Sequence, residues 1–156
     1  MVEKRTHSNF ETHRAGRDAV AGELSSRGYR VELAPGKSPA VDLLCRSPGG
    51  IEFCVKVSCL TKRKSWFLGN SARELRDKLF FVLVLLPASP LERAEYYILS
   101  HPQILDTLDE QDRANKEAGD ERGEPLADFP TSVYYKVVKK LTERFGRLDG
   151  WDKLPQ

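Results

Sequence analysis

Four side chains in two neighbouring stretches of the chain could do chemistry together. Asp42 lies in "VDLLC", and Glu52, Cys54 and Lys56 follow at every second position of "IEFCVKV". In an extended strand, alternate side chains face the same side, so the acid, the thiol and the lysine share one face. Carboxylates hold Mg²⁺ through hard oxygen ligands, and a nearby lysine can position or deprotonate an attacking water. The pattern is typical of a metal-dependent phosphodiesterase core.

A β-hairpin would position these residues. "VDLLC" and "IEFCVKV" are separated by the turn-forming linker "RSPGG", which favours an antiparallel pair. Pairing Cys45 with Ile51 keeps the apolar residues of both strands on one face, and it places Asp42 opposite Cys54. This register predicts that Asp42, Cys54 and Lys56 gather in one patch.

The remaining elements predict an α/β domain. We expect a helix over residues 11 to 27 that stops at Gly28, and the spacing of Ser100 and Gln103 predicts a capping box that opens a second helix. Strands are expected at "YRVEL", "SWFLG", "LFFVLVLL" and "EYYILS", and a further helix from about residue 134. Residues 109 to 130 are rich in charge and we expect them to form an exposed or mobile connection. These elements predict a mixed central sheet with flanking helices.

Size and composition indicate one domain over residues 1 to 156. No apolar run is long enough for a membrane span, and "MVEKRTHSNFETHRAG" has no apolar signal region, so we expect a cytoplasmic protein. The odd count of three cysteines without a CxxC spacing argues against a disulfide framework. Residues 1 to 80 hold 15 Lys and Arg against 9 Asp and Glu. Such an excess would suit a polyanion, and a solvated surface would explain it equally.

The stretch "VDLLCRSPGGIEFCVKVSCLTKRKSWFL" resembles the core of the PD-(D/E)XK nuclease superfamily, which has the restriction-endonuclease-like fold. With the preceding helix, "FFVLVLL" and "EYYILSHPQI", the resemblance covers roughly residues 14 to 105. It implies a restriction-endonuclease-like core and a Mg²⁺- or Mn²⁺-dependent endonuclease that hydrolyses phosphodiester bonds in DNA. It also implies a homodimer, because many nucleases of this type cut two strands.

The resemblance implies roles for individual residues. Asp42 would anchor the metal, Lys56 would position the attacking water, and Glu52 would complete the catalytic metal shell. A helix acid, Asp18 or Glu23, is an alternative to Glu52. Cys54 occupies the metal-ligand position where the family has Glu or Gln, and a soft thiolate is a poor partner for Mg²⁺.

The run Lys62, Arg63 and Lys64, followed by Trp66, forms a candidate nucleic-acid contact. The cations would contact phosphates and the indole ring would stack on a base or pack inward. A solvated loop explains the run equally.

Two other readings stay open. The first is a catalytically inactive nuclease-fold module for nucleic-acid binding or protein interaction, which Cys54 motivates. The second is an unrelated α/β domain whose alternating strand is a chance amphipathic edge, with Lys56 in water.

Overall fold

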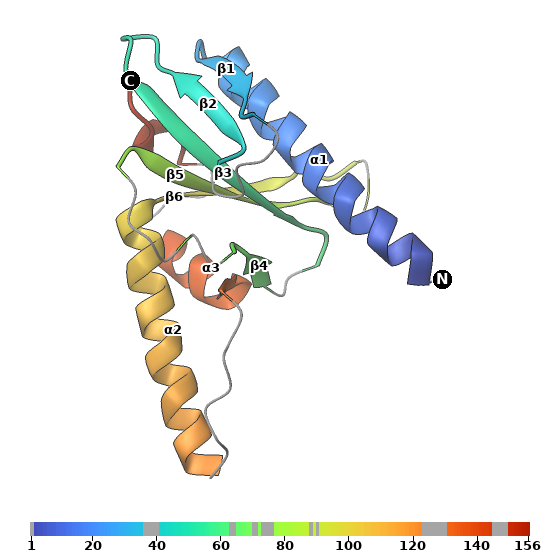
Figure 1. Cartoon of the computed structure of the whole chain (residues 1–156), viewed down its shortest axis with the longest axis vertical. Coiled ribbons are helices and arrows are strands. Elements are labelled where there is room, and N and C mark those ends of the chain that lie inside the picture. The colour runs from blue at the N-terminus through green and yellow to red at the C-terminus, as the bar shows by residue number, and fades with distance from the viewer. Residues whose placement is uncertain are drawn as a thin grey trace.

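The computed structural model describes residues 2–35, 41–62, 65–69, 72, 77–87, 89, 91–122, 131–144 and 150–156. The elements in chain order are α1 (Val2–Ser26), β1 (Arg30–Leu33), β2 (Leu43–Arg46), β3 (Glu52–Leu60), β4 (Ser65–Phe67), β5 (Leu79–Leu85), β6 (Glu95–Ser100), α2 (His101–Arg122), β7 (Ser132–Tyr134), α3 (Tyr135–Arg144) and the short 3-10 helix η2 (Trp151–Lys153). Figure 1 labels most of them along the chain.

The main sheet is mixed, as the sequence predicts. Its strand order is β1-β2-β3-β5-β6; β3 and β5 are parallel, and the other neighbours are antiparallel. A separate antiparallel ribbon joins β4 to β7. The chain is therefore an α/β domain with β3 near the centre of its sheet.

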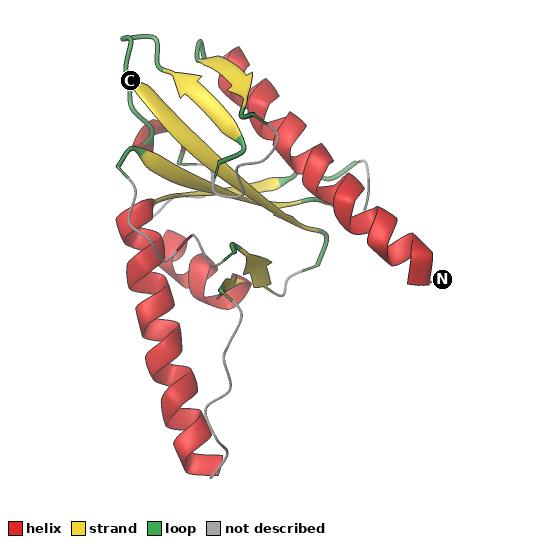
Figure 2. Ribbon diagram, viewed as in Figure 1, coloured by secondary structure: helices red, strands yellow, loops and turns green. Residues whose placement is uncertain are grey.

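Two hydrophobic cores cover the two faces of this sheet. Val20 and Leu24 of α1 pack with Val55 and Val57 of β3 on one face. The other face is covered by α2, α3 and the β4–β7 ribbon, whose buried residues include Trp66 and Val138. Figure 2 shows α1 on one side of the sheet and α2 and α3 on the other.

Local signals explain how the helices begin and end. Gly28 has φ of +91°, and the N–H groups of Gly28 and Tyr29 donate to Ser25 and Leu24, which closes α1 with a Schellman motif. At the start of α2, Ser100 Oγ accepts the Gln103 N–H and Gln103 Oε1 accepts the Ser100 N–H. The predicted stop at Gly28 and the predicted capping box of Ser100 and Gln103 are thus confirmed.

Helix α2 is longer than the sequence analysis expected. It continues to Arg122, so residues 109 to 122 are helical rather than part of a connection. Residues 123 to 130 lie outside the described part of the chain. Ala, Glu, Lys and Arg are good helix formers even where no apolar stripe is present. Among the described residues, no helix has the length and apolar character needed to cross a membrane.

Candidate functional site

The hairpin brings Asp42 and Lys56 together. Asp42 immediately precedes β2, and its Oδ2 lies 3.6 Å from Lys56 Nζ on β3. The side chains are only 13% and 16% exposed. The low exposure of Lys56 contradicts the reading in which this side chain lies in water. β3 is also not an edge strand, because β2 lies on one side of it and β5 on the other.

The register of the hairpin differs from the prediction by two residues. Cys45 pairs with Phe53 rather than Ile51, and Leu44 rather than Asp42 faces Cys54. The loop has the expected length but is shifted by one residue, to residues 47–51, where Ser47 N–H donates to Ile51 O and Gly50 has a φ of +91°. A shift of two residues preserves the faces. It moves Asp42 away from Cys54 and toward Lys56.

The Asp42 carboxylate closes the edge of β3 where its pairing with β2 ends. The Asp42 N–H donates to Val55 O at 2.9 Å, although Val55 already pairs with Leu43, so the ladder is irregular at this point. Asp42 Oδ2 then accepts the Val57 N–H at 2.7 Å. Without this carboxylate, an interior strand would lose a backbone hydrogen-bond partner. Asp42 therefore has a structural role as well as a charge partner.

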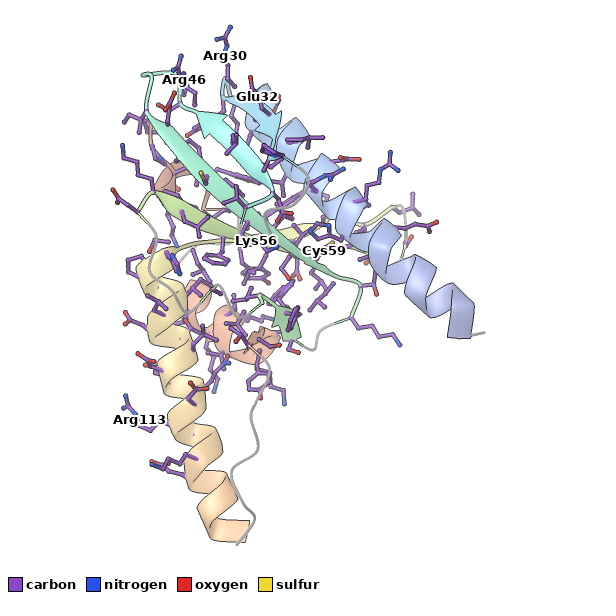
Figure 3. The ribbon with its side chains drawn as sticks, viewed as in Figure 1. Arg30, Glu32, Arg46, Lys56, Cys59 and Arg113 are labelled. Atoms are coloured by element: carbon purple, nitrogen blue, oxygen red, sulfur yellow. The ribbon has the colours of Figure 1, made fainter. Side chains whose placement is uncertain are left out.

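His13 of α1 completes the cluster. Its Nε2 lies 3.4 Å from Asp42 Oδ1, and its side chain is 42% exposed. The helix can lie this close because Gly16 has no side chain: a Cβ there would come within 2.5 Å of Cys59 Sγ. Cys59 and Lys56 are labelled in Figure 3 where α1 passes β3. Asp42, Lys56 and His13 together form the Asp42 cluster.

Several interactions set the pKa of Asp42. Burial alone would raise the pKa, but the hydrogen bonds from His13 and the Val57 N–H, together with the charge of Lys56, outweigh it. The pKa of Asp42 is therefore lowered from its ordinary value. The carboxylate is ionised at neutral pH.

His13 was not singled out by the sequence analysis. The acids Asp18 and Glu23 are the residues of this helix that the resemblance implies as helpers, and it implies no role for His13. The available signal was spacing, because His13 lies on the helical face of Gly16, Val20 and Leu24, at intervals of three and four residues. The last three are buried against the sheet.

Glu52 does not join the Asp42 cluster. Its Oε1 pairs with Arg46 Nη2 at 2.7 Å across the hairpin, and its side chain is 73% exposed. Glu52 and Lys56 are four residues apart on one strand, which corresponds to about 13 Å. The structure thus brings together Asp42 and Lys56 but leaves Glu52 at the far end of β3.

The two helix acids also lie elsewhere. Asp18 pairs with Arg17 at 3.6 Å and is 60% exposed. It is rotated by about 140° from His13 around the helix axis. Glu23 pairs with Arg27 at 3.4 Å, and its position ten residues beyond His13 corresponds to about 15 Å along α1.

These placements decide whether the cluster suits a magnesium ion. Cys54 is on the same strand face as Lys56, paired with Leu44, and its backbone N–H donates to Lys78 O at 2.8 Å. Within the described part of the chain, no three His, Cys, Asp or Glu side chains come together to hold a metal. A lone carboxylate whose oxygens already contact a lysine, a histidine and a backbone N–H does not fit Mg²⁺ or Mn²⁺, which need several hard oxygen ligands.

The predicted nucleic-acid contact is only partly described. Lys62 is exposed just after β3, and Arg63 and Lys64 lie outside the described residues. The stacking role of Trp66 is wrong, because the ring is fully buried, its Nε1 donates to Val84 O at 2.9 Å, and it packs on Tyr97 and Tyr135. Trp66 anchors the β4–β7 ribbon to the sheet. The inward-packing alternative is confirmed.

A hollow of about 520 Å³ is lined by residues of β1, β2 and β3 and by Asp77 and Lys78. It is lined by mixed charges, including Arg46, Glu52 and Lys78, and by Leu44 and Cys54, but not by Asp42 or Lys56. Lys78 has an unusual positive φ of 55° at this rim, where its carbonyl accepts the Cys54 N–H. The Asp42 cluster is therefore separate from this hollow.

No family model, curated protein or solved structure matches the chain. What the fold defines is an α/β domain with a mixed five-strand sheet. Its hairpin carries a largely buried aspartate and lysine in contact, with a helix histidine against the same carboxylate. A functional assignment has to be argued from this geometry.

Proposed function

We propose that the chain is a nuclease-like module that binds DNA but does not cut it through a divalent metal. The proposal rests on one observation: the oxygens of the Asp42 carboxylate already contact Lys56, His13 and the Val57 N–H. An aspartate and a lysine are brought together by a hairpin that follows a helix, as the resemblance to the PD-(D/E)XK superfamily implies. The same carboxylate is engaged by groups of the chain, and among the described residues no set of three metal-ligating side chains forms around it.

The charge distribution supports a polyanionic ligand. Arg14 is exposed on α1 next to His13, and Lys62 is exposed directly after β3. Both belong to the part of the chain with the net basic charge. Phosphate contacts of this kind give binding that weakens steeply as salt rises.

A binding assay tests this function. Fluorescence anisotropy with a labelled DNA duplex, measured over a series of salt concentrations in EDTA, should show metal-independent and salt-sensitive affinity. Arg14→Ala and Lys62→Ala should each weaken binding and reduce the salt slope by about one. Arg113→Ala is the matched control, because it removes the same charge from α2, far from the sheet (Figure 3).

A cleavage assay tests the absence of catalysis. Supercoiled and linear DNA incubated with Mg²⁺ or Mn²⁺ should remain intact with the wild-type chain. Metal-dependent cutting that is lost in Lys56→Ala would overturn the proposal, provided that circular dichroism shows the variant to be folded. An absence of salt-sensitive binding to DNA would overturn it equally.

The variant Cys54→Glu tests whether the Asp42 cluster derives from a functional metal site. The new carboxylate would stand two residues from Lys56 on the same face, about 6.6 Å along β3. Metal-dependent cutting by Cys54→Glu but not by Cys54→Ser would show that a missing hard ligand is what keeps the wild type inactive.

A further inference from the structure

Strand β1 forms one edge of the main sheet. It ends the strand order, and in the described part of the chain no strand pairs with its outer side. Arg30, Glu32 and Leu33 are exposed, with Leu33 at 58%. At the opposite edge, Lys153 Nζ donates to Ile98 O of β6 at 3.4 Å, so the C-terminal segment contacts that strand. An uncovered edge strand is a template for pairing with another chain.

The hydrogen bonds inside the sheet show which groups of β1 face outward. Ala34 N–H donates to Asp42 O at 2.9 Å, so Ala34 points its backbone groups toward β2. The direction of the backbone N–H and C=O groups alternates along a strand, so those of Glu32 and Arg30 also point toward β2. Val31 and Leu33 direct their N–H and C=O groups to the open edge.

We propose that β1 pairs antiparallel with β1 of a second copy of the chain, in a two-fold register centred on Val31. Each Val31 would exchange both backbone hydrogen bonds with Val31 of the second copy. Arg30 would then lie directly opposite Glu32 of the second copy, and this ion pair would occur twice. The main sheets of both copies would join into one continuous sheet.

Alternative self-pairing registers are less favourable. A register centred on Glu32 sets Glu32 opposite its own copy, and like charges directly opposite each other destabilise a sheet. A register centred on Leu33 sets Glu32 opposite Ala34, so the Arg30–Glu32 pairing between the copies is lost. The register centred on Val31 is the one in which the charges are complementary. Its flanking pairs set Leu33 opposite Tyr29, whose C=O can accept the Leu33 N–H while its own N–H stays bonded to Leu24 O.

The charges also explain why the occupant is a second copy. Edge strands commonly carry charges that discourage pairing. In β1 the two exposed charges have opposite signs at alternate positions, so an antiparallel copy meets attraction instead of repulsion. This interface lies at the strand edge and does not depend on the DNA-binding proposal.

Sedimentation equilibrium over a concentration series tests the pairing. The wild-type chain should dimerise reversibly, and Arg30→Glu or Glu32→Arg alone should raise the dimer dissociation constant about tenfold, because each variant sets like charges opposite one another at two positions. The double variant R30E/E32R should return to near the wild-type value. Glu110→Arg, an exposed charge reversal on α2, is the control and should have no effect.

Cysteine cross-linking tests the register independently. Hydrogen-bonded antiparallel pairs have Cα atoms about 5.5 Å apart, within the range of a disulfide. Val31→Cys should therefore form a disulfide-linked dimer under mild oxidation, whereas Glu32→Cys and the parent chain should not. A monomeric wild type at all concentrations, a charge swap that fails to restore association, or cross-linking by Glu32→Cys alone would each overturn the proposal.

Discussion

Replacing Asp42 with alanine should destabilise the fold by about 3 kcal/mol, at the lower end of the cost of breaking a buried ion pair. The change leaves Lys56 Nζ without the carboxylate at 3.6 Å and the Val57 N–H without its acceptor at 2.7 Å. The lysine side chain is only 16% exposed, so water compensates poorly. Urea denaturation followed by the fluorescence of the buried Trp66 and Trp151 measures the free energy of unfolding.

A double-mutant cycle separates the ion pair from its surroundings. Lys56→Met keeps most of the apolar stem of the side chain and leaves Asp42 bonded to Val57 and His13, so it should cost only about 1 kcal/mol. The double variant Asp42→Ala/Lys56→Met removes the stranded charge, and it should be more stable than the sum of the single changes predicts by about 1 to 2 kcal/mol. Additivity within about 0.5 kcal/mol would refute the reasoning, because the two groups would then not interact.

Three further measurements follow from the same geometry. The pKa of Asp42 is lowered in the folded state, so the ionised carboxylate stabilises the fold fully above the unfolded pKa of about 4. This stabilisation is lost as pH falls through the folded pKa. In urea titrations at acid pH, the difference in unfolding free energy between wild type and Asp42→Asn should therefore shrink. Gly16→Ala should destabilise the fold by about 1 to 3 kcal/mol, because its Cβ would meet Cys59 Sγ. The matched change Gly22→Ala, whose Cβ meets nothing within 4 Å, should stabilise the fold by about 0.5 to 1 kcal/mol. Equal thermal midpoints of the two variants would contradict the close contact between α1 and β3. Trp66→Phe removes the hydrogen bond from Nε1 to Val84 O, so it should lower stability in urea and leave DNA affinity unchanged. Weaker DNA binding by a folded Trp66→Phe variant would show that the ring contacts DNA.

The hairpin shows how far periodicity can predict a site. Alternation correctly assigned the faces of β3, because any register that exposed the apolar set would be unfavourable. It could not choose between Ile51 and Phe53 as the partner of Cys45, since both lie on the same face. The position of the loop at residues 47–51, with Gly50 at positive φ, sets that choice, and it decides whether Asp42 meets Cys54 or Lys56.

Other features depended on contacts distant in sequence. The basic run before Trp66 predicts a residue that stacks on a base or packs inward, and the pairing of β4 with β7 encloses the ring. His13 becomes informative only once Gly16 is known to lie against Cys59. The polar end of α2 forms a helix although its composition predicts a connection, because Ala, Glu, Lys and Arg have high helix propensity.

The Asp42 cluster also indicates what a metal would have to overcome. A divalent ion bound at Asp42 would lie beside the ammonium of Lys56, and the hydrogen bond from the Val57 N–H would have to be shared or lost. One carboxylate cannot offset three positive charges in a site that is largely shielded from water. A second carboxylate at residue 54 would change this balance, because two negative charges would then face the ion and the lysine. Cys54→Glu is thus a test of charge as well as of ligand type, and Cys54→Gln, which offers an oxygen without charge, separates the two.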